Sequence, residues 1–435
     1  MNFVYEDLPN RMNLLSSNVE VNGDNFLSKY FRFNNCPITN DINDLGNINY
    51  TAVKYLGPRE YTIKKRPRRY IIPVGLNKSP NEWIGGYDKS KGITGKDYIF
   101  DYLRPEYLKD LQTGRAFLLL DSSLEGYHTD TIFDYLHSQC GRNKISPTQI
   151  IFISGNMLLE QNYTKWFYST DHEDSIHCLG YPHFELEVYK NLWERKYREF
   201  IEIIDFDSHM VYKQENYIDI KLYSCTNKRP RPHRIALFKG LVENDLLNKG
   251  VVSMDYFEPY DIKEEGFDIK GEELEKLTPL LPRYPYGISL NAKPTSYYIK
   301  RFNEKHALDS WVNVVSEARY SDEEKTVFLS EKIFKAIALQ QPFIVVGSKN
   351  TLKYLKKLGY KTFSEHFDES YDELEDTERI SKVLEVLNSI DTIEDKLSWY
   401  EKMKPIFEHN SYQLQHHSTK DIMPQYKSLL NHYFR

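Results

Sequence analysis

The residues best suited to chemistry in this sequence stand together at an expected helix start. Ser330 occupies a position typical of an N-cap, and Glu331 and Lys332 follow it directly. A helix start offers free backbone N–H groups and the positive end of the helix dipole, to which Lys332 adds an ammonium group. This combination favours a diphosphate, and the Glu331 carboxylate can accept hydrogen bonds from ribose or sugar hydroxyls. The same three residues are also typical of an ordinary capped surface helix.

A second basic loop precedes another expected helix. The strand predicted at 219–225 is followed by the sequence TNKRPRPHR, which ends at Arg234. Apolar residues at helical spacing follow from Ile235 to Val242, so the loop leads into a helix. Guanidinium groups at a helix start suit an anionic ligand, and the loop is therefore a second candidate phosphate site. The other cations of the loop also fit plain surface charge: Lys228, Arg229 and Arg231.

Two carboxylates follow the first strongly apolar strand, which is predicted at 116–120. Asp121 and Glu125 come just after it, and a carboxylate partly removed from water at such a strand end can deprotonate an acceptor hydroxyl. Glu125 is our first choice for this base, because Gly126 allows a ligand to approach the backbone closely. Asp121 is the second choice. Either carboxylate fits equally well in a turn that caps the helix beginning near Thr129.

Alternating strands and helices must position these residues, which indicates parallel α/β domains. Around Ser330 the sequence predicts a strand at 311–315, a helix, a strand at 343–346, a second helix and a last strand ending at Phe363. Ligands of parallel sheets bind at the carboxyl ends of strands, against helix starts, and Ser330 occupies such a position. The first half of the chain has its own pattern of this kind, with strands at 116–120 and 149–153.

Two segments resemble the α1,3-fucosyltransferase family of GT-B glycosyltransferases. Phe328-Leu-Ser-Glu-Lys332 and Pro342-Phe-Ile-Val-Val-Gly-Ser348 are similar to the family's aromatic-x-Thr/Ser-Glu-Lys helix start and the Pro-x-x-x-x-Gly strand after it. The family's second domain opens with a strand that ends in Ser-Asn, a short loop and an arginine at the next helix start. Arg234 matches that arginine, and Asn227 matches the asparagine with an offset.

The resemblance, which covers roughly a tenth of the chain, implies a nucleoside-diphosphate sugar as donor, either a GDP-sugar or a UDP-sugar, and inverting chemistry. It implies that Glu331 holds ribose or sugar hydroxyls and that Lys332 and Arg234 hold the diphosphate. Because arginine, lysine and helix dipoles can stabilise the anionic leaving group, no metal is expected to be required. The further donor-site candidates are Asn227, Glu317 and Ser330.

Asp205-Phe-Asp207 spells DxD, the pattern that holds Mn²⁺ or Mg²⁺ through oxygen ligands in the other common glycosyltransferase architecture, GT-A. It follows the apolar run 200–204, which could form a strand. However, a pattern this short occurs often by chance, and the Ser-Glu-Lys segment and the two βαβ halves are not GT-A features. The sequence therefore predicts no metal site.

Length and composition set the broad class. A chain of 435 residues exceeds one typical core, so two domains are expected, and a net charge of −6 argues against general affinity for nucleic acid. No run of about 18 apolar residues is present to span a membrane, and the N-terminus shows no signal peptide. The four cysteines are scattered without a C-x-x-C pair, which favours free thiols in a reducing, cytoplasmic location.

The sequence thus predicts an α/β protein of the GT-B class, with two Rossmann-like βαβ domains that face a central cleft. An N-terminal acceptor-side domain is expected at 1–215, a nucleotide-sugar-binding domain at 216–385 and bracing C-terminal helices at 386–435. The expected activity is transfer of a sugar from a nucleoside-diphosphate sugar to a hydroxyl of a glycan or a small molecule. The sugar, the nucleotide base, the acceptor and the oligomeric state are left open.

Two other functions also fit the sequence. One is a bacteriophage-type DNA glycosyltransferase that modifies a hydroxylated base, since the basic clusters at 64–69 and 228–234 could follow a duplex. A composition rich in Asn, Lys, Tyr and Ile is in keeping with an AT-rich genome, and salt-sensitive DNA binding would distinguish this function. The other is a non-catalytic nucleotide-sugar-binding protein, which would bind a nucleotide without transferring or hydrolysing the sugar.

Overall fold

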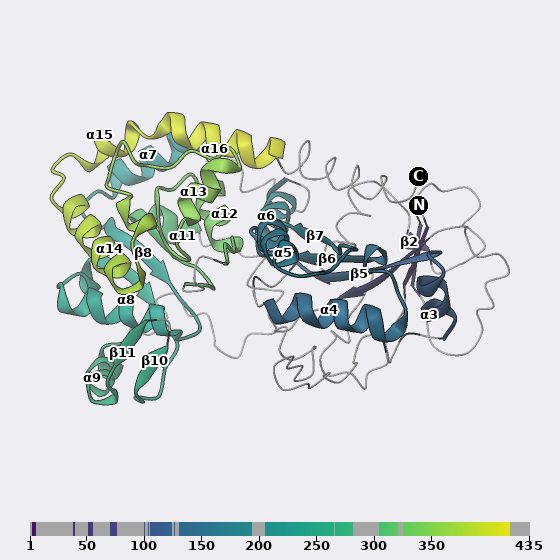
Figure 1. The fold of residues 1–435 in the computed structure, drawn as a ribbon. Helices are drawn as coiled ribbons and strands as arrows, with labels where there is room; N and C mark the ends of the chain where they lie inside the picture. The colour runs from purple at the N-terminus through teal and green to yellow at the C-terminus, as the bar shows by residue number, and fades with distance from the viewer. Residues whose placement is uncertain are drawn as a thin grey trace. The chain divides into compact units, whose positions relative to one another are not determined.

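The computed structural model describes residues 2–5, 38–39, 51–54, 70–75, 100, 103, 105–123, 126, 130–193, 205–264, 266–281, 304–320 and 325–417. These residues fall into two compact α/β units, the first ending at His183 and the second running from Phe184 to His417 (Figure 1). The expected class, an α/β protein with two Rossmann-like domains, is confirmed. The predicted boundaries at residues 215 and 385 and the predicted cleft stay predictions.

The first unit is built on a parallel sheet, which has seven strands in the described part of the chain. The strand order is β2-β3-β1-β4-β5-β6-β7, and all neighbours run in the same direction. The central strands β5 and β6 are continuous apolar runs, as expected for strands covered on both faces. The strands are β1 (Asn2–Tyr5), β2 (Ile38–Thr39), β3 (Thr51–Lys54), β4 (Tyr70–Gly75), β5 (Ala116–Ser122), β6 (Ile150–Ser154) and β7 (His177–Gly180).

Helices cover this sheet through aromatic and aliphatic contacts. Leu118 and Phe152 of the sheet share one buried core with Phe133 and Tyr163, whose rings meet edge to face at 5.1 Å. Such an edge-to-face pair adds to the free energy gained by burying the rings. The helices of this part are α3 (Pro105–Gln112), α4 (Asp130–Asn143), the short η4 (Pro147–Gln149) and α5 (Leu159–Tyr168). Helix α6 (His183–Trp193) begins at the last residue of the first unit and otherwise belongs to the second unit.

The second unit has a smaller parallel sheet, of four strands among the described residues, in the order β13-β12-β8-β9. From β8 the chain passes to β9 on one side, and it then crosses over to β12 on the other side of β8. The direction of winding therefore reverses between β8 and β12, and ligands of open parallel sheets bind at such a point, outside the carboxyl ends of the strands. The strands are β8 (Lys221–Thr226), β9 (Gly250–Ser253), β12 (Ser310–Ser316) and β13 (Phe343–Val346).

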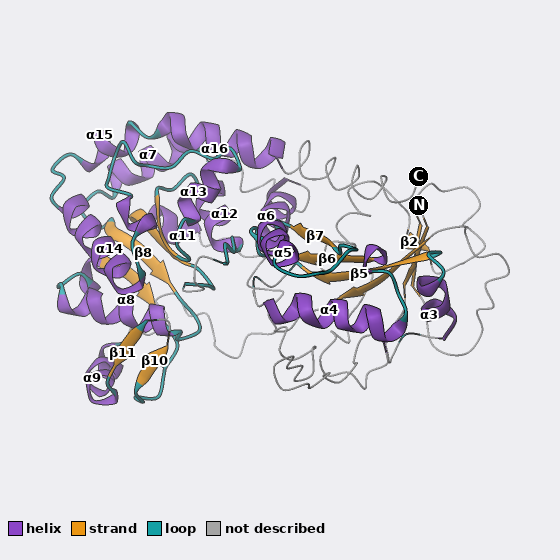
Figure 2. Ribbon diagram, viewed as in Figure 1, coloured by secondary structure: helices purple, strands orange, loops and turns teal. Residues whose placement is uncertain are grey.

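Helices flank this second sheet (Figure 2). Helices α8 and α14 pack on each other, whereas α12 packs on β12, β13 and α16. A small antiparallel hairpin of β10 (Ile262–Glu264) and β11 (Phe267–Ile269) contacts α8 through β11. The helices are α7 (Phe206–Glu215), α8 (Pro232–Glu243), α9 (Gly271–Leu277), α11 (Glu304–Leu308), α12 (Glu331–Ala338), α13 (Thr351–Lys357), α14 (Asp376–Asp391), α15 (Lys396–Glu401) and α16 (Lys404–His416), with short turns η6 (Leu247–Lys249), η7 (Thr278–Leu280) and η8 (Ser370–Glu373).

The strand expected to end at Phe363 is not formed. Side chains occupy the backbone groups that a strand would use for its ladder, since Asn410 bonds both the N–H and the carbonyl of Lys361, at 2.8 and 2.9 Å. Glu369 accepts the N–H of Phe363 at 2.6 Å. These bonds come from distant residues and satisfy the segment without a sheet neighbour.

The C-terminal helices pack within the second unit as far as they are described, with α16 on α12. Their predicted bracing role towards the first domain stays a prediction. None of the helices in the described ranges combines the length and the apolar character needed to cross a bilayer.

Candidate functional site

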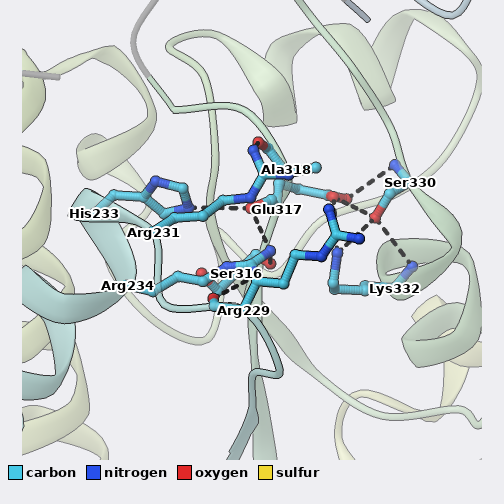
Figure 3. A network of polar contacts seen from close by, with 9 residues as sticks. All are labelled: Arg229, Arg231, His233, Arg234, Ser316, Glu317, Ala318, Ser330 and Lys332. Carbon is cyan, nitrogen blue, oxygen red and sulfur yellow. Dashed lines mark hydrogen bonds and ion pairs between the residues drawn. The ribbon is translucent and has the colours of Figure 1, made fainter. Parts of the chain in front are cut away.

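The candidate site lies in the second unit, at the carboxyl ends of β8 and β12, where the sheet reverses its winding. Asn227 follows the end of β8, and Glu317 follows the end of β12. Helix α8 begins after Arg231 and α12 begins after Ser330, so two helix starts belong to the same network of polar contacts (Figure 3). The structure thus brings together the residues that the sequence assigned to two separate phosphate loops.

Glu317 joins the end of β12 to the start of α12. Its side chain is only 1% exposed, and its carboxylate accepts the Ser330 backbone N–H at 3.1 Å and the Ser330 hydroxyl. Burial raises the pKa of Glu317, and this effect is opposed by the nearby Lys332 ammonium and by the hydrogen bonds from Ser330. The carboxylate therefore fixes Ser330, the N-cap of α12, at the edge of the sheet.

Lys332 completes this contact from the first turn of α12. Its Nζ lies 3.3 Å from the Ser330 hydroxyl oxygen and 4.0 Å from a Glu317 carboxylate oxygen. Its backbone N–H bonds the same Ser330 hydroxyl oxygen, as expected for a helix capped by serine. The Lys332 side chain remains 28% exposed, so its ammonium group stays accessible to an anion.

A glycine directly after the neighbouring strand, β13, leaves space for the Glu317 side chain. Gly347 follows β13, whose Val346 lies opposite Ser316 of β12. A Cβ atom on Gly347 would lie 3.2 Å from the Cβ and 3.3 Å from the Cγ of Glu317, which is tighter than ordinary packing. The close approach of the two segments therefore depends on the absence of a side chain at this position.

Arg234 is almost completely buried behind the loop after β12. It is 5% exposed, and its Nη2 donates to the carbonyls of Ser316 at 3.2 Å and Glu317 at 2.9 Å, while Nη1 donates to the carbonyl of Arg229 at 3.1 Å. Burial lowers the pKa of Arg234 to about 10. The guanidinium thus links the basic loop after β8 to the loop after β12.

Two neighbours of Arg234 hold the same loop. Nε2 of His233 lies 3.1 Å from the Glu317 carbonyl and must carry the proton, because a carbonyl only accepts. Nη1 of Arg231 donates to the Ala318 carbonyl at 2.7 Å. The carbonyls from Ser316 to Ala318 are therefore all bound by side chains from the start of α8 or its cap.

The remaining predicted donor-site residues differ in exposure. Asn227 is buried and donates its backbone N–H to Ser253 at 2.9 Å, so it lies next to the end of β9. Glu331 is partly exposed at the first position of α12. Arg229 and Lys228 are exposed, and in Figure 3 the Arg229 and Lys332 side chains extend towards the same part of the network. The accessible part of the site is thus mainly cationic.

Buried polar atoms at this edge add hydrogen-bonding capacity. Among the described residues, the buried atoms without a hydrogen-bond partner include four from the start of α8, the end of β12 and the segments after β12 and β13. They are Arg234 Nε, Ser316 Oγ, Thr326 Oγ1 and Ser348 Oγ. Buried polar atoms are normally paired, so these atoms leave hydrogen-bonding capacity unused at this edge.

The predicted catalytic bases belong to the first unit. Asp121 lies in β5, where its backbone is opposite Gly75 of β4 and Ile153 of β6. Glu125 and the basic cluster 64–69 lie outside the described residues. The roles of both carboxylates stay predictions.

The DxD segment serves as a helix start. Asp205 is the N-cap of α7 and accepts the Ser208 backbone N–H at 2.9 Å, while Asp207 pairs with Lys404 at 2.8 Å. In the described ranges, no group of three or more His, Cys, Asp and Glu side chains is arranged to hold a metal ion.

Two contributors to the site were not among its predicted residues, His233 and Gly347, although Gly347 belongs to the segment that resembles the family's Pro-x-x-x-x-Gly strand. The signal for Gly347 was its place directly after an apolar strand, next to the strand that ends at Glu317. His233 gave no signal of its own, since its partner Glu317 lies 84 residues further along the chain.

No protein-family model matches the chain, and no curated protein is similar to it in sequence. Among solved structures it is similar to an α1,3-fucosyltransferase, with 8% identity, 98% of this chain and 90% of that chain covered, and a TM-score of 0.37. An α,α-trehalose 6-phosphate synthase from Burkholderia multivorans gives 9% identity, coverage of 77% of both chains and a TM-score of 0.37. A UDP-forming α,α-trehalose-phosphate synthase from Burkholderia vietnamiensis gives 10% identity, coverage of 77% of this chain and 79% of that chain, and a TM-score of 0.36. Because all three TM-scores are low, the assignment of the fold rests on the sheets and helices of this chain and not on these similarities.

Proposed function

We propose that this chain is a glycosyltransferase that takes a sugar from a nucleoside-diphosphate sugar bound on its second unit. The observation that carries the proposal is the convergence of two helix starts, one with Arg231 and Arg234 and the other with Lys332, at the β8–β12 reversal point of a parallel sheet. Helix starts bind phosphate groups through free N–H groups and the helix dipole, and the reversal point is where such sheets hold nucleotides. The resemblance of the Ser330-Glu-Lys332 segment to the α1,3-fucosyltransferase family agrees with this assignment.

The six predicted donor-site residues divide into two groups by exposure. Lys332 and Glu331 are accessible, and they contact the donor: the ammonium group binds the diphosphate, and the carboxylate accepts hydroxyls of the ribose or the sugar. The other four are buried: Asn227, Arg234, Glu317 and Ser330. Glu317 and Ser330 hold the start of α12, and Arg234 holds the backbone of Glu317. Arg229, exposed on the adjoining loop, adds a second cation for the diphosphate.

The reaction follows from these charges. An oxygen of the acceptor hydroxyl attacks the anomeric carbon, the bond between that carbon and the phosphate oxygen breaks, and the nucleoside diphosphate leaves with the electron pair. Lys332, Arg229 and the start of α12 stabilise the charge that develops on the leaving group, so the mechanism needs no metal ion. The hydroxyl proton goes to a carboxylate of the first unit, Glu125 as first choice or Asp121, and attack from the opposite face inverts the anomeric centre.

The donor and the acceptor belong to stated chemical classes. The donor is a GDP-sugar or a UDP-sugar, and the acceptor is a hydroxyl of a glycan or a small molecule. A hydroxylated base in DNA is the alternative acceptor, and the assay below includes it.

Release of nucleoside diphosphate tests the proposal. The purified chain is incubated with a panel of GDP-sugars and UDP-sugars, with glycosides or DNA that contains hydroxymethylated pyrimidines as acceptors, and both the diphosphate and the glycosylated product are measured. We expect release with one nucleotide class, and the Lys332→Ala variant should lose at least about tenfold in kcat/KM, because a charge-assisted phosphate contact is worth roughly 1.5–3 kcal/mol.

Lys335→Ala is the matched control, since Lys335 lies on the same helix but in its last turn. It should keep wild-type activity. Equal activity of the Lys332→Ala variant and the wild type would show that the start of α12 does not bind the donor. Nucleotide binding without release of diphosphate or transfer would point to a binding protein instead of an enzyme.

A further inference from the structure

A buried arginine on α14 links the two loops that flank Glu317. Arg379 is 2% exposed, and its Nη1 donates to the Gly347 carbonyl at 2.5 Å and to the Tyr320 carbonyl at 3.3 Å. Its Nε and Nη2 donate to the Leu374 carbonyl at 3.2 and 2.8 Å. One guanidinium therefore holds the loop after β12, the loop after β13 and the segment that leads into α14.

Tyr320 extends this link to the start of α8. The Arg379 guanidinium lies over the Tyr320 ring at 4.8 Å, and the His233 ring stacks on the same ring at 5.0 Å with an angle of 8° between the planes. The Tyr320 hydroxyl donates to the Asp376 carbonyl on α14. Since His233 also bonds the Glu317 carbonyl, contacts run without a break from α14 to the backbone of Glu317.

These contacts constrain Glu317 from α14 as well as from its own sheet. Gly347, which Arg379 holds through its carbonyl, packs directly against the Glu317 side chain. A lysine could not replace this link, because an ammonium group is a compact point charge, whereas the planar guanidinium directs several N–H groups in fixed directions. The position of the Glu317 carboxylate thus depends on a residue that does not contact it.

We propose that Arg379 is a positioning residue for the donor site. It sets the loops after β12 and β13 so that Glu317 holds Ser330 and Lys332 in the geometry that binds the donor diphosphate, without touching the donor itself. This inference rests on the function proposed above. It adds a residue of the C-terminal helix α14 to the determinants of donor affinity.

Loss of stability alone does not test this role, because removing Arg379 leaves buried carbonyls unpaired and destabilises any fold. Coupling to Lys332 does test it. If Arg379 positions Lys332, then the loss of affinity caused by Lys332→Ala must be smaller when Arg379 is already changed, because the two residues act on the same contact. A purely structural arginine gives two independent, additive effects.

The experiment measures dissociation constants of GDP and UDP by titration calorimetry, well below the melting temperature of each variant. The proteins are the wild type, Lys332→Ala, Arg379→Met and the double variant, with Arg379→Lys as a milder replacement that keeps the charge if Arg379→Met does not fold. Lys382→Met is the control on α14, since Lys382 forms ion pairs with Asp368 and Glu385 at 3.0 Å, outside the site.

We expect Arg379→Met and Arg379→Lys each to weaken nucleotide binding on the order of tenfold, and Lys332→Ala to have a clearly smaller effect in either background than in the wild type. Lys382→Met should bind like the wild type. Wild-type affinity in a folded Arg379→Lys variant, or fully additive effects, would overturn the inference and leave the proposed function intact. A wild-type chain that binds neither nucleotide would overturn the proposed function, and the inference with it.

Discussion

At the scale of single residues, the candidate donor site depends on a buried carboxylate, Glu317, directly after β12. Glu317 is almost completely removed from solvent, and Ser330 donates two hydrogen bonds to its carboxylate. Burying a carboxylate costs free energy unless it is hydrogen-bonded or paired, and here both kinds of partner come from the first residues around α12. The protonation state of Glu317 is therefore coupled to the position of Ser330 at the start of α12.

The stability of the chain should reflect this burial. The pKa of Glu317 is raised in the folded state, so between its unfolded value of about 4.3 and its folded value the native state binds more protons than the unfolded state. Its contribution to the free energy of unfolding therefore falls as the pH rises through that window. Glu317→Gln has no such dependence, and its stability relative to the wild type should increase as the pH rises above about 4.3.

Urea unfolding at a series of pH values measures this difference. Glu378→Gln, which changes an exposed carboxylate on α14, is the control with which the Glu317→Gln difference is compared. A difference for Glu317→Gln that stays flat, or that decreases with pH, would contradict the description of Glu317 as a carboxylate dominated by burial.

Residues also show where prediction from sequence stops. Ser330 was identified as an N-cap because capping depends on neighbours one turn away, and the structure has this cap. The burial of Arg234 was not predictable, because its acceptors at Ser316 and Glu317 lie 82 and 83 residues away. A helix cap can be predicted because its partners are near in sequence, whereas the burial of an arginine depends on residues that only the fold brings close.

At the scale of elements, the site requires β12 and β13 to pack closely at their carboxyl ends. Gly347→Ala places a methyl group within 3.2 Å of Glu317, so the Glu317 side chain must shift by a few tenths of an ångström. We expect nucleotide affinity to fall roughly threefold to tenfold, because small displacements of binding groups are costly in a constrained site. Titration calorimetry with GDP and UDP measures the effect.

Gly141→Ala is the control for this substitution. Gly141 lies near the end of α4, and a methyl group there meets no atom within 4 Å. Nucleotide affinity should be unchanged, and stability should rise by about 0.5–1 kcal/mol because alanine is the better helix former. Equal affinities for the Gly347→Ala variant and the wild type would show that Glu317 can move without consequence.

Elements were predicted well where the apolar pattern was long and continuous. The strands at 116–120, 149–153, 311–315 and 343–346 all appear, at most a few residues longer or shifted. The segment before Phe363 failed because Asn410 and Glu369, distant in sequence, satisfy its backbone groups. An extended segment becomes a strand only when a neighbouring strand is available, and sequence pattern alone does not supply that neighbour.

At the scale of the whole molecule, the chain carries two parallel α/β units, and the candidate donor site is contained in the second of them. The reversal of winding between β8 and β12 explains why loops 90 residues apart by chain order, after Thr226 and after Ser316, form one site. Two helix starts then supply the positive charge. Under the proposed function, the second unit therefore binds the nucleotide part of the donor.

The most direct test of this account is the change in melting temperature with GDP, UDP, CDP and ADP, each with Mg²⁺ and with a chelator. A ligand that binds only the native state stabilises it by mass action, by about 2.7 kcal/mol at one hundred times its dissociation constant. We predict an upward shift with GDP or UDP that persists with the chelator and is lost in Lys332→Ala but kept in Lys335→Ala. No shift with any nucleotide, or a shift of equal size in Lys332→Ala, would contradict it.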